Sequence, residues 1–142
     1  MSAAPNELML VEVGNCIELM TGGAFVLGDT LLIGWRPQDA PDRVAVVLEQ
    51  AGGEVHPDLP DRVDLHAQVL TRSYDYHEAR DDAYAVFRAI HGKCCDALPI
   101  ESGANYKNEI IDAIAAPAYI GQDEKGRFEF STNYVWLFKE AP

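Results

Sequence analysis

The chain has 142 residues, 48% of them hydrophobic and 24% charged, which is close to ordinary soluble composition and fits one domain over residues 1–142. Eleven basic residues stand against 23 acidic ones, and the net charge of −12 disfavours a protein that grips nucleic-acid phosphates or an anionic membrane. DNA could still pass beside so acidic a protein without sticking. The sequence shows no secretion signal and no apolar run of membrane-spanning length.

The cysteines and histidines predict neither a disulfide framework nor a metal site. Cys16 stands alone, and the adjacent pair Cys94 and Cys95 is too constrained for an ordinary bridge, so a reduced compartment is expected. The histidines do not have the spacing of zinc ligands: His56, His66, His77 and His91. We therefore expect no metal and no cofactor.

The first third of the chain predicts one helix and two strands. Apolar residues recur on one face from Asn6 to Met20, and the glycine pair 22–23 ends this helix. A short strand is expected at Leu31–Trp35 and a fully apolar one at Val44–Gln50. The segment 52–61, rich in glycine and proline, predicts a long exposed connection.

A strand passes directly into a helix between Arg62 and Ile90. Apolar and polar residues alternate from Val63 to Val69, the period of a half-buried strand. Asp75 and Glu78 have capping-box spacing, so each side chain is expected to accept from a free backbone N–H of the first turn. One face of the helix carries apolar residues: Ala79, Ala83, Val86, Phe87 and Ile90.

The C-terminal part predicts strands around a tight turn. Asn108–Ala115 suits a helix or a strand, and we favour a strand; Asp123–Gly126 suits a turn with glycine in the left-handed position. An aromatic-rich face follows: Phe128, Phe130, Thr132, Tyr134, Trp136 and Phe138. Core packing is favoured over base stacking because an acidic chain lacks basic support, and any surplus predicts a subunit interface. The fold class is α+β, a mostly antiparallel sheet with the N-terminal and central helices packed on one face.

No signature of catalysis is present. Ser73, Ser102 and Ser131 lie in no G-x-S-x-G motif, and neither a phosphate-binding loop nor an H-E-x-x-H motif occurs. Asp81 and Asp82 diverge on a helix and predict a solvated face rather than an acid–base pair. We expect a protein that is not an enzyme and has no catalytic residues.

Several segments, in this order, resemble phage minor capsid proteins of the tail-terminator type. They are LGDTLLIGW (27–35), PQDAPD (37–42), VDLHAQVLTRSYDYHEARDDAYAVFRAIHG (63–92) and PAYIGQDEKGRFEFSTNY (117–134). Positions that fit the family pattern are Arg72, Tyr76, Ala79 and Asn133. The resemblance covers residues 27–134 and implies a tail-terminator-like domain.

The resemblance implies a structural virion protein of a long-tailed phage or a phage-like gene-transfer agent, assembled in the host cytoplasm and located in the tail or neck. Such proteins form a ring, usually of six copies, that ends the tail tube and joins it to the head connector. The implied partners are copies of the chain itself, the tail tube protein and the head–tail connector or stopper protein. DNA would pass through the lumen without specific binding, and no membrane is involved.

Ring contacts are expected on the strand Val63–Arg72 and on the hairpin around Gly126. The candidate interface residues are Arg72, Tyr74, Tyr76, Asp123, Glu124 and Arg127. Basic residues are scarce, yet Arg72 and Arg127 fall on the polar parity of strands, so we expect them to meet carboxylates on a neighbouring copy.

Two other classes stay open. The net charge of −12 fits equally well an acidic binding module, of immunity or inhibitor type, that covers a basic partner. Electron microscopy separates this class from a ring, because a one-to-one inhibitor would show no rings. A small enzyme with an unfamiliar chemistry is the residual alternative.

Overall fold

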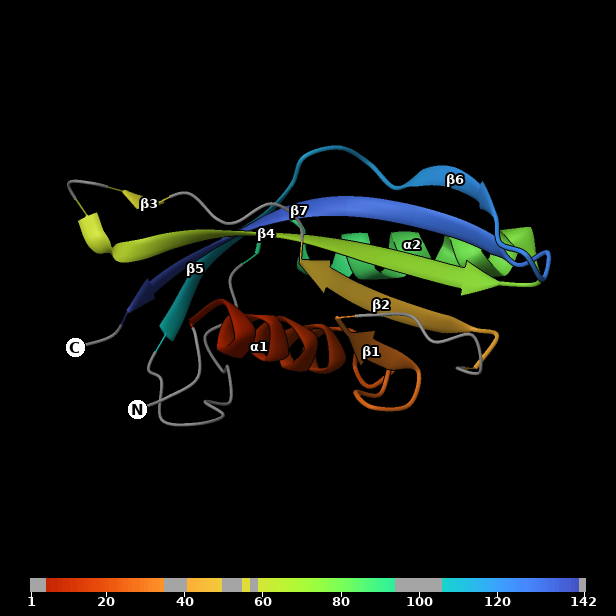
Figure 1. Cartoon of the computed structure of the whole chain (residues 1–142), viewed down its shortest axis with the longest axis horizontal. Helices are drawn as coiled ribbons and strands as arrows, with labels where there is room; N and C mark the ends of the chain where they lie inside the picture. The colour runs from red at the N-terminus through yellow and green to blue at the C-terminus, as the bar shows by residue number, and fades with distance from the viewer. Residues whose placement is uncertain (1–4, 35–40, 50–54, 57–58, 94–105, 141–142) are drawn as a thin grey trace.

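Seven strands form one sheet in the part of the chain that the structure describes, and two helices accompany it (Figure 1). The computed structural model describes residues 5–34, 41–49, 55–56, 59–93 and 106–140. In chain order the elements are α1 (Pro5–Met20), β1 (Leu31–Ile33), β2 (Val44–Glu49), β3 (Val55–His56), β4 (Leu59–Ser73), α2 (Tyr76–Ile90), β5 (Tyr106–Ala113), β6 (Ala118–Gln122) and β7 (Phe128–Glu140).

The sheet is antiparallel except at one edge. The strand order is β1-β2-β4-β7-β5, with β3 beside β4 and β6 beside β7. Only the pair β1–β2 is parallel among these pairings. The predicted α+β class with a mostly antiparallel sheet is therefore confirmed.

The strands β4 and β7 form the long axis of the sheet. They pair from Arg62 opposite Lys139 to Ser73 opposite Phe128. The short strand β3 lies beside the start of β4, whereas β6 lies beside the start of β7, so β3 and β6 lie at opposite ends of the sheet (Figure 1). β4 is bonded to β2 from Ala67 to Arg72 as well, so this part of the strand lies inside the sheet rather than at an edge.

The helix α1 ends at Met20, as predicted, and begins at Pro5, one residue before the predicted start. Proline suits the first turn of a helix because its missing N–H would have no partner there. At the other end, the N–H of Gly23 donates to the carbonyl of Glu18 (3.0 Å), and the N–H of Gly22 donates to that of Leu19 (3.1 Å). Both glycines have positive φ, which few other residues adopt cheaply.

The helix α2 is capped by Asp75, but the predicted capping box is wrong in its second half. The Asp75 carboxylate accepts from the N–H of His77 (2.9 Å). Glu78 does not reach back to the cap; it accepts from the hydroxyl of Ser73 (2.7 Å), which itself accepts from the N–H of Asp75 (3.2 Å). Ser73 occupies the place that the carboxylate of Glu78 would take.

Both helices pack on the same face of the sheet, as predicted. One continuous apolar cluster joins Val13 and Ile17 of α1, Val86 and Ile90 of α2, and Trp136 of β7. Other members of this cluster are Cys16, Phe25, Leu31, Ala45, Val47, Leu65, Ala67, Val69, Ile111 and Tyr134. Phe130 lies in a second apolar cluster, with Ala79 and Ala83 of α2. The prediction that the aromatic face of β7 packs in the core is therefore confirmed for Phe130, Tyr134 and Trp136.

The strand ends differ from the predictions in two places. The segment 52–61, expected to be an exposed connection, contains β3. β4 already begins at Leu59, because a proline near the start of a strand, here Pro60, removes no hydrogen bond that the sheet needs. β1 ends at Ile33. The favoured strand reading of Asn108–Ala115 is confirmed by β5. Cys94 and Cys95 lie outside the described residues.

Candidate assembly surface

One end of the sheet gathers most of the residues that the sequence singled out. It is built from the C-terminus of β4, the N-terminus of α2, and β6 with the turn that leads into β7 (Figure 1). We call this region the hairpin end. A strand that stops beside a helix start and a tight turn presents loop residues on a rigid base, which is where binding residues commonly lie.

The turn between β6 and β7 is fixed by its first residue. The N–H of Gly126 donates to the carbonyl of Asp123 (3.0 Å), and Gly126 has the predicted positive φ of 84°. The Asp123 carboxylate also accepts from the backbone N–H groups of Lys125 (3.0 Å) and Arg127 (2.9 Å) and from Nε of Arg127 (2.7 Å). One carboxylate therefore holds the whole turn in a single shape.

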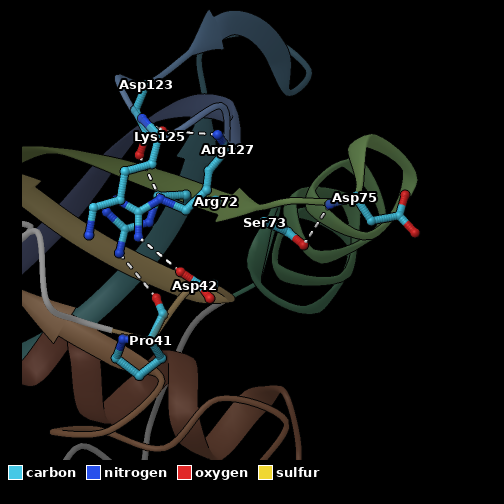
Figure 2. Close-up of polar contacts among 8 residues, drawn as sticks. All are labelled: Pro41, Asp42, Arg72, Ser73, Asp75, Asp123, Lys125 and Arg127. Atoms are coloured by element: carbon cyan, nitrogen blue, oxygen red, sulfur yellow. Dashed lines mark hydrogen bonds and ion pairs between the residues drawn. The ribbon is translucent and has the colours of Figure 1, made fainter.

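The two arginines of the predicted interface are buried beneath this turn (Figure 2). Arg127, with no exposed surface, bonds to Asp123 and, through Nη1, to Asp42 (3.2 Å). Arg72, 2% exposed, donates to the carbonyl of Pro41 (3.1 Å). Both side chains thus reach the segment that leads into β2. The carboxylates expected on a neighbouring copy are in fact supplied to Arg127 by its own chain, because the polar face of the sheet is covered here.

The charges under the turn shift each other's proton affinity. Burial alone would raise the pKa of Asp123, but the hydrogen bonds from Arg127 and its positive charge, with the bond from Lys125, lower that pKa below its ordinary value. Burial would lower the pKa of Arg127, and the two carboxylates of Asp123 and Asp42 raise it instead. Both groups are therefore charged at neutral pH and hold each other in place.

The outer surface of the hairpin end is aromatic. Tyr76 makes edge contacts with Tyr119, Phe128 and Phe130 at centroid distances of 5.5, 5.6 and 5.2 Å. Tyr76 and Tyr119 remain 37% and 47% exposed in spite of these contacts. Tyr74 lies just before them in the loop and is 53% exposed. The rings of Tyr76 and Tyr119 thus form a partly solvated patch beside the rigid turn.

The structure divides the six predicted interface residues into two sets. Tyr74, Tyr76 and Glu124 are exposed. Arg72 and Arg127 are buried and Asp123 is half-buried, so these three form the support beneath the turn. The structure brings all six to the hairpin end.

Two features of this region were missed by sequence reasoning. Tyr119 and Ile120, at 47% and 51% exposure, stand on β6 as adjacent apolar residues just before the turn, which was the available signal. Asp82 was expected on a solvated face but is buried at 5% exposure, and Arg43 donates to both of its oxygens (2.9 and 2.7 Å). Asp81 is exposed as expected.

The described residues offer no arrangement typical of metal chemistry. Within them no three histidine, cysteine, aspartate or glutamate side chains cluster in a way that could hold a metal ion. The helices in the described part are too short or too polar to cross a membrane. The hairpin end instead combines a fixed turn with exposed aromatic rings.

The family model described as "Bacteriophage tail terminator protein" matches residues 23–138. The chain belongs to the phage tail terminator family. Among the described elements, the match spans every strand except the end of β7, and α1 alone precedes it; the match also contains the whole hairpin end. The protein is therefore a structural protein of the virion, located in the tail, and the resemblance seen in the sequence is confirmed.

A solved structure has the same fold. It is titled "Virion of native gene transfer agent (GTA) particle", and the superposition gives a TM-score of 0.60 at 9% identity, covering 96% of this chain and 95% of that chain. At this identity the likeness concerns the fold alone. No curated protein matches the chain.

Proposed function

We propose that the protein forms a ring that ends the tail tube and joins it to the head connector. The observation that carries the proposal is the family match over residues 23–138, which includes a rigid hairpin end with exposed aromatic rings. In this proposal the protein stops growth of the tube by occupying its last position. The resemblance implies six copies in such a ring.

The hairpin end is suited to contact a neighbouring copy or the tube. Exposed apolar side chains gathered in one place mark interaction sites, and tyrosine is enriched in them because its large ring loses little conformational freedom on binding. We assign the contact to Tyr74, Tyr76 and Glu124, with Tyr119 and Ile120 added by the structure. Arg72, Asp123 and Arg127 act by holding this surface in shape.

A closed ring uses head-to-tail contacts, in which one end of a subunit meets a different surface of the next. The sheet of this protein is elongated, with β3 at the opposite end from β6 (Figure 1). Two dissimilar ends on one rigid sheet support such an arrangement. The excess of acidic residues supports the passage of DNA through the lumen, because like charges prevent adhesion.

The test is whether purified protein caps tail tubes, seen by negative-stain electron microscopy. The variant Y74A/I120A removes two hairpin-end side chains of 53% and 51% exposure. Its matched control L19A/I114A removes apolar side chains of 55% and 61% exposure that lie elsewhere. We expect the wild type and the control to cap tube ends and Y74A/I120A to leave them open while keeping its melting temperature.

Two outcomes would contradict the proposal at different levels. Uncapped tubes with the wild-type protein would refute the tube-terminating ring itself. Equal capping by Y74A/I120A and the control would leave the ring in place and refute the assignment of its contacts to the hairpin end.

A further inference from the structure

The five arginines whose side chains the structure describes fall into two groups by what their guanidinium groups contact. Three of them bond to oxygen atoms of their own chain: Arg43, Arg72 and Arg127. The other two, Arg80 and Arg88, have exposed side chains on α2, and within the described residues neither forms an ion pair. In a protein with twice as many acidic as basic residues, it is unexpected that two cations have no carboxylate partner among the described residues.

These two arginines share one aromatic ring. The guanidinium carbon of Arg80 lies 4.5 Å from the ring centroid of Tyr84, and that of Arg88 lies 5.4 Å from the same centroid. The three residues are spaced four apart, so they form a stripe along α2 next to the face that Ala83 and Val86 bury in the core. We call this set the arginine stripe.

The arginine stripe is prepared to receive anions. Each cation–π contact is worth roughly 0.5–1 kcal/mol at an exposed site, and it limits the rotamers that a long side chain would otherwise sample. A guanidinium group also presents donors in a planar fork that matches a carboxylate. Two cations held against one ring repel each other, and an arriving carboxylate relieves that repulsion.

Charge decides which occupant fits. Copies of this chain each carry a net charge of −12 and repel one another, so a ring needs a cationic patch on one copy that meets an acidic surface on the next. Exposed carboxylates are plentiful on the described surface, for example Asp29, Glu49 and Glu124. We propose that the arginine stripe of α2 is the site where carboxylates of a second copy dock; this inference rests on the proposed ring.

The test compares two variants with the same net charge. R80Q/R88Q removes two positive charges, and K93E replaces one exposed positive charge by a negative one, so both change the net charge from −12 to −14. Glutamine keeps a helix propensity close to that of arginine. The measurement is the protein concentration that caps half of the tail tubes in negative-stain images, at about 50 and 200 mM NaCl.

We expect R80Q/R88Q to need about tenfold more protein than the wild type at low salt, and K93E to stay within about twofold, because only the arginine stripe meets carboxylates. The defect should shrink at high salt. Equal behaviour of the two variants would overturn the assignment while the wild-type ring stands. Loss of duplex DNA binding by R80Q/R88Q without a capping defect would also overturn it, since the stripe would then serve phosphates. A wild type that caps no tubes would refute the ring on which the inference rests.

Discussion

The two faces of the sheet are held by different forces. The face under the helices is apolar, with Leu65, Tyr134 and Trp136 fully buried against α1 and α2. The opposite face is polar at the hairpin end, where Arg72 and Glu129 stand opposite each other in the register and both are buried. Apolar burial stabilises without regard to direction, whereas buried charges require particular partners in particular places.

The two faces therefore have separate roles in the stability and the shape of the hairpin end. The helix face supplies the free energy that keeps the sheet together. The charged face fixes where the turn at Asp123 and the segment at Asp42 lie, because one buried guanidinium group joins both. The helix face should therefore tolerate small changes of shape, and the charged face should tolerate hardly any change of charge.

The largest expected effect is on the helix face. Trp136→Ala removes a fully buried indole from the apolar cluster and should lower the free energy of unfolding by about 4 kcal/mol, measured by urea denaturation. A loss below about 1 kcal/mol would show that this face is not the main source of stability.

The second largest effect is expected on the charged face, from a substitution that removes a charge and keeps the volume of the side chain. Asp123→Asn leaves the buried Arg127 with a neutral partner and one remaining carboxylate, Asp42. We expect a loss of about 3 kcal/mol, since a buried charge deprived of its partner is costly. The matched control is Glu124→Gln on the exposed side of the same turn, which should stay within about 0.5 kcal/mol. Equal effects at both positions would refute the structural role of the ion pair.

The stabilisation by Asp123 should depend on pH. Its pKa is lowered in the folded protein, so the carboxylate stabilises the fold above its unfolded pKa of about 3.9 and loses that effect as the pH falls through the folded value. The difference in unfolding free energy between the wild type and Asp123→Asn should be constant from about pH 7 to 5 and narrow toward about pH 3. A difference that widens on acidification would contradict the assigned charge.

The smallest expected effect adds volume to the helix face. A Cβ at Gly14 would lie 2.7 Å from Cδ1 of Ile33, the end of a flexible side chain that can move aside. Alanine also favours a helix over glycine by about 1 kcal/mol, so Gly14→Ala should change stability by less than about 1 kcal/mol in thermal unfolding. A loss larger than that of Asp123→Asn would reverse the comparison between the two faces.

The features that could be predicted from the sequence are those that depend on local periodicity, such as which residues of a helix or strand face the core. The spacing of apolar residues in α2 and the aromatic parity of β7 were enough to name the residues that face the core, because local spacing alone sets those directions. The turn at Gly126 followed from the same kind of local signal, a glycine where φ must be positive.

Long-range pairing was beyond the reach of local patterns. Arg127 and Asp42 are 85 residues apart, and Arg43 and Asp82 are 39 apart, so no spacing rule could join them. Alternation marks a polar face but does not say whether another segment covers it, which is why Arg72 was expected to reach outward. The residues that the sequence named lie at one end of the sheet, but the sequence did not predict which of them are buried and which are exposed.

The most direct test of the tail-terminating role is the length of tail tubes grown from purified tube protein with and without this protein. We predict that adding it during growth stops elongation, so that tubes stay short when more tube protein is supplied. Tubes that continue to lengthen at the same rate in its presence would contradict the account.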